Sequence, residues 1–115
     1  MEPALDLEKL SSTAGVKSYY IVKHDGSLVG AKAEAATEIT QFLALSGLNG
    51  EAICSLLGHS RFNHMILSRQ SKESILIFPV EGHFLAIMKE PGAATADLIP
   101  SIRELINGSK AKTMD

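Results

Sequence analysis

Four histidines and one cysteine are the side chains of this sequence with the greatest capacity for metal or nucleophile chemistry. A zinc-binding helix places two histidines four residues apart, because that spacing puts both rings on one side of the helix. No histidine here has such a partner. His59 and His64 lie five apart across a change of element, and His24 and His83 lie at a predicted turn and a predicted strand start. The spacing therefore predicts histidines at exposed turns and no metal site.

The cysteine and the serines form no nucleophile motif. Cys54 stands in an apolar helical segment, where a free cysteine behaves as a small hydrophobic residue. Ser60, Ser68 and Ser71 lack the strand–turn–helix context of a nucleophile elbow. Residues 47–51 (Gly-Leu-Asn-Gly-Glu) have no preceding strand and no following Gly-Lys-Ser/Thr, so they do not predict a phosphate loop. We therefore expect no catalytic residue and no cofactor, and a chain that is not an enzyme.

Length and composition indicate a single globular domain. A chain of 115 residues, 45% hydrophobic and 21% charged, fits one domain; we expect it to span residues 1–107, with a flexible tail over 108–115. The net charge of −2 and scattered lysines and arginines argue against a nucleic-acid partner. The N-terminal residues lack a signal-peptide pattern, and no apolar run approaches the roughly 20 residues that span a bilayer. We expect a cytoplasmic protein with no membrane span.

The first third of the chain predicts a short helix and a β-hairpin. Acidic residues early and a lysine late favour a helix over Pro3–Ser11. Two runs rich in β-branched, aromatic and aliphatic residues, Val16–Val22 and Ser27–Ala31, flank Asp25 and Gly26. An Asp-Gly pair between two strands favours a two-residue type I′ turn, in which both central residues have positive φ.

A long helix is predicted over Glu34–Leu57. The face that carries Ile39 and Phe42 continues in phase to Ile53 and Leu56, which favours one helix over two unrelated ones. The two glycines inside this segment each cost about 1 kcal/mol relative to alanine. A kink or break in the middle therefore stays open.

Three strands and a helix complete the pattern. We predict strands over Phe62–Arg69, Ile75–Phe78 and His83–Met88, joined by tight turns, and a final helix over Leu98–Ile106 that ends at Gly108. Consecutive strands with tight connections form antiparallel sheets. The sequence thus predicts an α+β domain: an antiparallel five-stranded sheet with helices on both faces, in the order α-β-β-α-β-β-β-α.

The middle helix is apolar around more of its circumference than one buried face requires. Apolar residues occupy much of its circumference, namely Ile39, Phe42, Leu43 and Leu45, and the same helix carries small residues such as Ser46 and Gly47. A helix that is apolar beyond one stripe must be covered on more than one side. Two interpretations stay open: the helix is buried inside its own monomer, or it forms a subunit interface where small residues let a partner helix approach closely.

The order of elements resembles the roadblock / dynein light-chain superfamily. The resemblance rests on the hairpin at 20–29 (Tyr-Ile-Val-Lys-His-Asp-Gly-Ser-Leu-Val), on Ser74–Phe78 and on His83–Met88 followed by the final helix, and it covers Val16–Ile106. It implies a homo- or heterodimer paired through the middle helix and the third strand. Members of this superfamily act as scaffolds and as regulators of small Ras-like GTPases, in bacteria often beside the GTPase that sets cell polarity.

The resemblance implies a non-catalytic homodimeric scaffold or regulator of a small Ras-like GTPase, of the bacterial type. Together with the wide apolar arc, it places the dimer or partner interface on nine residues: Ile39, Phe42, Leu43, Ser46, Gly47, Ile53, Phe62, His64 and Ile66. The alternative is a profilin-like or PAS-like domain that senses a small molecule, or serves as an accessory domain, and binds its ligand inside the monomer.

Overall fold

A computed structural model describes residues 7–31, 37–58, 63–67, 74–80 and 82–114. Along this part of the chain the elements are α1 (Leu7–Ser12), β1 (Val16–Lys23), β2 (Leu28–Ala31), α2 (Thr37–Leu56), β3 (Met65–Leu67), β4 (Ile75–Val80), β5 (His83–Lys89) and α3 (Thr95–Met114). The predicted α+β class and the order α-β-β-α-β-β-β-α are confirmed. No helix in the described ranges is long and apolar enough to cross a membrane.

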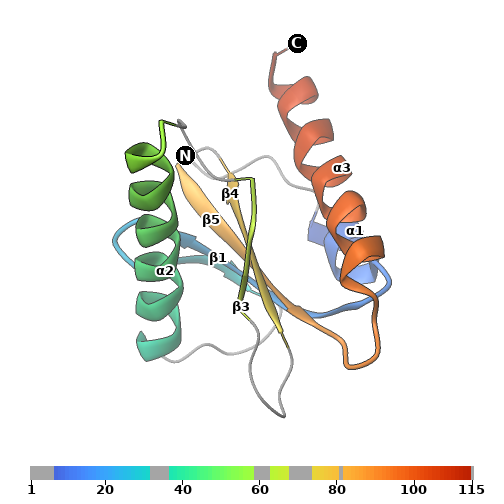
Figure 1. The fold of residues 1–115 in the computed structure, drawn as a ribbon. Coiled ribbons are helices and arrows are strands. Elements are labelled where there is room, and N and C mark those ends of the chain that lie inside the picture. Colours follow the sequence, from blue (N-terminus) through green and yellow to red (C-terminus); the bar gives the residue numbers. More distant parts are fainter. Residues whose placement is uncertain (1–6, 32–36, 59–62, 68–73, 81, 115) are drawn as a thin grey trace.

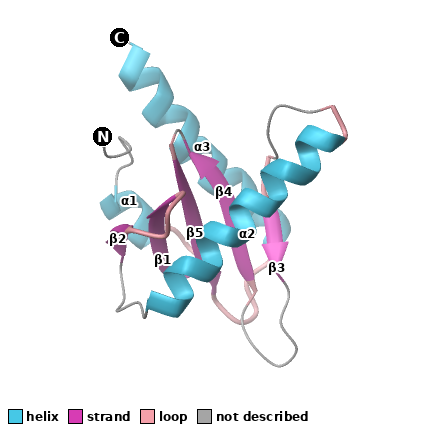
Figure 2. Cartoon of the chain, turned by 90° about the vertical axis from the view of Figure 1, so that its left-hand side faces the viewer, coloured by secondary structure: helices cyan, strands magenta, loops and turns pink. Residues whose placement is uncertain are grey.

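The described strands form one antiparallel sheet in the order β2-β1-β5-β4-β3. The first and the last strand of the chain pair in the middle of this sheet, with Tyr19 opposite Ile87. Helix α2 covers one face, and α1 and α3 cover the other (Figure 1). Seen from the side of α2, this helix crosses the sheet diagonally from the β1–β2 side to the β3 side (Figure 2).

Strand alternation divides the core into two clusters. In β1, Tyr19 and Ile21 point toward α1 and α3, whereas Tyr20 and Val22 point toward α2. Every residue of β4 and the first five residues of β5 are buried. A strand that is apolar on both faces must be covered on both faces, so the helices on either side follow from the sequence of these two strands.

The β1–β2 turn is longer than the sequence analysis predicted. The Gly26 N–H donates to the Lys23 carbonyl (3.0 Å) and the Lys23 N–H to the Ser27 carbonyl (2.9 Å), which leaves His24, Asp25 and Gly26 as a three-residue loop. Such loops combine a type I turn with a positive-φ residue in third position, and Gly26 has a φ of 91°. The hairpin prediction is therefore confirmed, but the two-residue type I′ turn is wrong.

Other boundaries differ in detail. Strand β3 is shorter than Phe62–Arg69, although both ends of that range lie outside the described residues. Helix α3 continues past Gly108 to Met114 and so includes most of the segment expected to be a tail. One glycine costs a helix only about 1 kcal/mol relative to alanine, and the Ser-Lys-Ala-Lys that follows contains three good helix formers.

We predict that Gly26→Val destabilises the domain by about 1–3 kcal/mol, because a β-branched residue resists positive φ. A Cβ at this position would also lie 3.2 Å from Cγ of Gln41 in α2. Urea unfolding, monitored by circular dichroism, measures the loss in the free energy of unfolding. Gly82→Val is the matched control for crowding: its φ is also positive, at 74°, but a Cβ there meets no atom within 4 Å. If the Gly26→Val protein is as stable as its parent, the loop does not require a positive φ at this position.

Candidate functional site

Helix α2 has one buried face, which packs on the sheet. This face consists of Thr40, Leu43, Ala44, Gly47 and Gly50. Leu43 and Ala44 join the cluster formed with Val22 and Phe84 on the α2 side of the sheet. The helix is unbroken despite its two glycines, because tertiary packing stabilises a helix more than its intrinsic propensity does.

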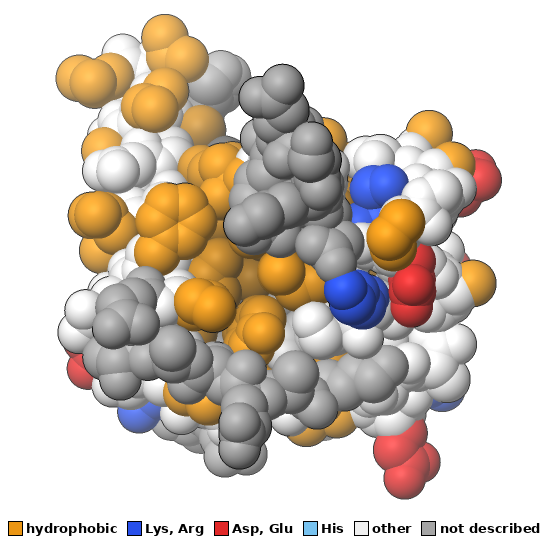
Figure 3. Space-filling view, turned by 90° about the horizontal axis from the view of Figure 1, so that it is seen from below, with side chains coloured by type: hydrophobic (Ala, Val, Ile, Leu, Met, Phe, Trp, Pro, Cys, Tyr) orange, Lys and Arg blue, Asp and Glu red, His pale blue; other side chains and the backbone are white. Residues whose placement is uncertain are grey.

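The other side of α2 is apolar and exposed. We call this the outer face of α2; it comprises Ile39, Phe42, Leu45, Leu48, Ile53 and Leu56, with Leu57 directly after the helix, and these side chains are 38–87% exposed. From Thr37 to Leu56 the sequence has two charged residues, both acidic. Figure 3 shows hydrophobic side chains gathered along the left of the molecule, where α2 lies, beside a hollow lined by further apolar groups. Large exposed apolar patches on soluble domains mark binding surfaces.

The outer face divides into two stripes, because successive residues of an α-helix are 100° apart. Ile39, Phe42 and Ile53 form one stripe, which Leu57 extends. Leu45, Leu48 and Leu56 form the other. Gln41 lies on the same side of the helix as the second stripe, between Leu45 and Leu48 on the helical projection, and it packs against the β1–β2 turn at Gly26. The Ile39–Phe42–Ile53 stripe is therefore on the flank of α2 away from this turn.

Strand β3 is an edge of the described sheet, paired with β4 alone. Met65 and Leu67 point toward α2 and pack against the same cluster as Cys54. Ile66 points toward the opposite face of the sheet and is 42% exposed. An edge strand presents backbone N–H and C=O groups that can pair with another chain. The C-terminal half of α2 lies on this side of the molecule (Figure 2).

The nine residues predicted for the interface fall into distinct environments. Ile39, Phe42, Ile53 and Ile66 are exposed, and Ser46 and His64 are half-buried. Leu43 and Gly47 are buried inside the monomer and so do not belong to the outer face. Phe62 lies outside the described residues.

Sequence reasoning did not single out Leu45, Leu48, Leu56 and Leu57 as exposed. Taking Leu43 and Gly47 as the centre of the buried stripe would have identified Leu45, Leu48 and Leu56, since these three residues lie away from it on the helical projection. Leu57 follows the end of the helix, so the projection does not apply to it. The apolar sequence alone does not fix that rotation.

Gly47 is where α2 comes closest to the sheet. A Cβ at this position would lie 2.6–2.7 Å from carbons of the Phe84 ring, well inside van der Waals contact. The ring also stacks on His24, with 4.7 Å between centroids. The small residue that suggested a close helix–helix contact thus serves a close helix–sheet contact.

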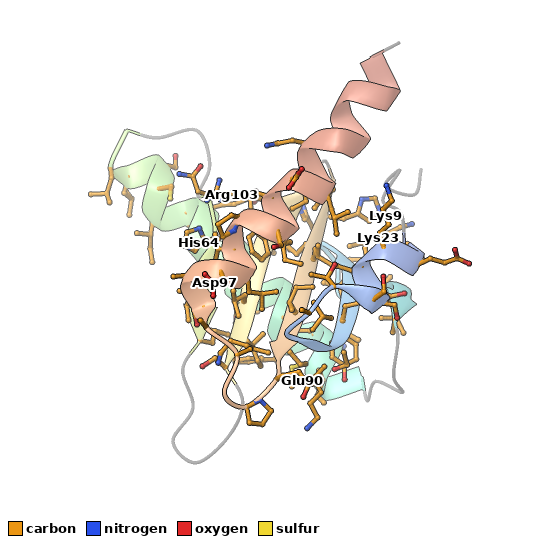
Figure 4. The ribbon with its side chains drawn as sticks, turned by 90° about the vertical axis from the view of Figure 1, so that its right-hand side faces the viewer. Lys9, Lys23, His64, Glu90, Asp97 and Arg103 are labelled. Atoms are coloured by element: carbon orange, nitrogen blue, oxygen red, sulfur yellow. The ribbon has the colours of Figure 1, made fainter. Side chains whose placement is uncertain are left out.

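His64 and Arg103 form a polar contact between β3 and α3. Arg103 Nη2 donates to Nδ1 of His64 over 2.7 Å (Figure 4). The His64 ring also lies 6.0 Å from that of Phe78. Burial lowers the pKa of the His64 imidazole below its usual value, and the positive charge of Arg103 lowers that pKa further.

The described residues show no group of three or more histidine, cysteine, aspartate or glutamate side chains that could hold a metal ion. Cys54 is a half-buried free thiol that packs against apolar side chains. Among the described residues, the buried polar or charged side chains are Thr40 and His83, and the other buried side chains are hydrophobic. In this part of the chain the outer face of α2 is therefore the most prominent candidate for a binding surface.

Comparison with known proteins identifies the fold. No family model matches the chain, and no curated protein matches it. The roadblock/LC7 domain from Streptomyces avermitilis superposes with a TM-score of 0.76 at 12% identity, over 99% of this chain and 98% of that one. Myxococcus xanthus MglB gives 0.70 at 14% identity, over 86% and 83%. Schizosaccharomyces pombe profilin gives 0.65 at 15% identity, over 86% and 88%. The chain has a roadblock-like fold, as the sequence resemblance implied.

We predict that Gly47→Ala destabilises the domain, although the same change inside an exposed helix stabilises it by about 1 kcal/mol. The added methyl must displace the Phe84 ring or lift α2 from the sheet, and overpacking of this kind costs about 1–3 kcal/mol. Thermal unfolding shows whether the substitution lowers or raises the stability of the domain. Ser46→Ala, one residue earlier and half-buried, is the control and should be close to neutral. A gain in stability for Gly47→Ala would show that the contact is loose.

Proposed function

We propose that this chain is a non-catalytic dimeric scaffold that regulates a small Ras-like GTPase. The observation that carries the proposal is the outer face of α2, an exposed apolar surface beside an open sheet edge on a roadblock-like fold. The sequence resemblance supplies the GTPase as partner, and the physical properties of the surface support association with proteins.

A second copy of the chain suits this surface. Burying a large apolar side chain contributes about 1.5–3 kcal/mol, and the outer face offers several that are at least half exposed in the monomer. In a two-fold dimer each copy contributes the same patch, so one apolar stripe covers another. The nearby edge of β3 would meet its own copy across the same axis, and two identical strands related by a perpendicular two-fold axis pair antiparallel.

We assign the Ile39–Phe42–Ile53 stripe to the second copy, with Ser46 as the small residue that permits close approach. Ile66 and His64 lie on the other face of β3, so they would flank the paired edges instead of facing the partner helix. Phe62 remains part of the proposed interface. Leu43 and Gly47 do not, because their contacts lie within the monomer.

The second stripe, Leu45, Leu48 and Leu56, would then be free for the GTPase. A two-fold dimer presents this stripe twice, and one GTPase could span both copies. Helix α2 contains no arginine, and charge supplied in trans to a GTPase normally comes from an arginine. We therefore expect the dimer to affect hydrolysis by positioning the GTPase's own catalytic groups.

The similarity to profilin keeps a ligand-binding domain as the second candidate. Ligand sites combine an apolar cleft with several convergent polar groups. In the described residues the buried polar or charged side chains are Thr40 and His83, one on each side of the sheet. This distribution favours the protein-binding proposal.

We predict a homodimer that Phe42→Asp converts to a monomer. Light scattering should give about twice the 12.3 kDa chain mass for the parent. The carboxylate would be buried unpaired in the dimer, at a cost of several kcal/mol, but it stays hydrated in the monomer because Phe42 is 51% exposed there. The variant should therefore keep its circular dichroism spectrum and its cooperative unfolding.

Asn107→Asp is the matched control, since it adds the same charge to an exposed residue of α3, across the sheet from α2. It should remain dimeric. A parent protein that stays strictly monomeric from micromolar to millimolar concentration would exclude the dimer.

We further predict binding to a small GTPase of the same genome, loaded with a GTP analogue, at a Kd below about 100 μM by calorimetry. Leu45→Asp should weaken this binding about tenfold or more, because a charge replaces a contact that is 58% exposed in the monomer. The same variant should leave the dimer intact. If no Ras-like GTPase binds below that threshold, the GTPase assignment fails and the scaffold proposal stands on the dimer alone.

A further inference from the structure

The hydrogen bond between Arg103 and His64 fixes the protonation state of the histidine. A guanidinium group has only donors and does not lose its charge in proteins. Since Arg103 Nη2 donates to His64 Nδ1 over 2.7 Å, Nδ1 must carry a lone pair, and the ring is neutral with its proton on Nε2. A protonated ring would direct an N–H at the guanidinium and place two positive charges in contact.

The described residues around His64 are mostly apolar, and the charged group among them that contacts the ring is a cation. On β4 the residues that point to this side of the sheet are Leu76, Phe78 and Val80. Between Thr95 and Asn107, α3 carries three charged residues, Asp97, Arg103 and Glu104. Of these, Arg103 contacts the His64 ring, and its positive charge adds to burial in lowering the pKa of that imidazole. Figure 4 shows the Arg103 and His64 side chains side by side next to α3.

The edge strand has few other attachments. Strand β3 is three residues long and, among the described strands, hydrogen-bonds to β4 alone. His64 directly precedes β3 and connects it to α3 on the face of the sheet opposite α2. Losing that connection leaves β3 with its pairing to β4 and with the half-buried Met65 and Leu67 beneath α2.

We propose that the Arg103–His64 hydrogen bond is a pH-sensitive tie that holds the edge strand β3 to α3. Protonation of His64 breaks the tie and loosens β3, and this weakens pairing with a second copy at the same edge. The last step rests on the dimer of the proposed function, whereas the loosening of β3 is a property of the monomer.

The direction of the pH effect follows from proton linkage. The folded protein lowers the pKa of His64 below the value of about 6.5 that the unfolded chain has, so the unfolded state binds the proton more readily. The tie therefore contributes its full stabilisation above about pH 6.5 and loses it as the pH falls through the lower pKa of the folded protein.

Amide hydrogen exchange at about pH 7.5 and about pH 5.5, corrected for intrinsic rates, tests the tie across the range where histidine titrates. Exchange reports local opening of each segment. In the full-length protein we expect protection of residues 65–67 to fall about threefold or more at the lower pH, with protection of Leu85–Ile87 in the central strand unchanged.

His64→Asn is the decisive variant. The Oδ1 atom of asparagine can accept a hydrogen bond from Arg103 near the position of His64 Nδ1, but the asparagine side chain has no titratable group. Its β3 protection should be the same at both pH values. Arg103→Met should give low β3 protection at both. Equal loss of protection on acidification in the parent and in His64→Asn, or no loss in the parent, would overturn the proposal.

Analytical ultracentrifugation of the same proteins distinguishes this proposal from the proposed dimer. For the parent we expect a dimer dissociation constant about threefold or more higher at the acidic pH, and no such shift in His64→Asn. A chain that is monomeric at both pH values would exclude the dimer, while the exchange data would still decide whether the tie exists.

Discussion

The close approach of the α2 backbone at Gly47 to the Phe84 ring is the contact on which the rest of the architecture depends. It sets the height of the helix above the sheet, because any larger side chain would meet the ring at 2.6 Å. It also sets the rotation of the helix about its axis. With Gly47, Leu43 and Thr40 turned inward, Phe42, Leu45 and Ile53 must point outward. One glycine thus determines both the packing of the core and the composition of the exposed surface.

Most of the fold was predictable from the sequence, for identifiable reasons. The runs Tyr19–Val22, Ile75–Phe78 and Leu85–Ile87 are apolar without helical period, and Gly26 marks a sharp turn. The turn type was not predictable from Asp25 and Gly26, because two- and three-residue loops use the same residues. The loop is distinguished by hydrogen bonds, among them one from the Ser27 N–H to Asp25 Oδ1 (2.9 Å) that also lowers the pKa of this carboxyl.

The candidate surface was less predictable than the fold. Periodicity identifies the inner face of a helix when the outer face is polar, but α2 carries large apolar residues on both its inner and its outer face. Leu43 and Phe42 are therefore indistinguishable in sequence, although one is buried and the other half exposed. The contact of His64 with Arg103 joins residues 39 positions apart, and neither residue lies in a motif. At 12–15% identity the similar structures define the fold, while individual side chains must be interpreted from this chain's own contacts.

The pairing of β1 with β5 also has a consequence for how the chain reaches its native state. The chain between these two strands, residues 24–82, is about half of the domain. Their pairing therefore requires closure of a long loop, and the entropy of that closure is lost before the contact stabilises the fold. During synthesis β1 emerges early and has only β2 as a neighbour until β5 leaves the ribosome. Until β5 is made, the edge of β1 that carries Tyr19–Val22 lacks the strand it pairs with, and unpaired strand edges favour aggregation. The order of elements makes this domain slow to complete and dependent on its last third.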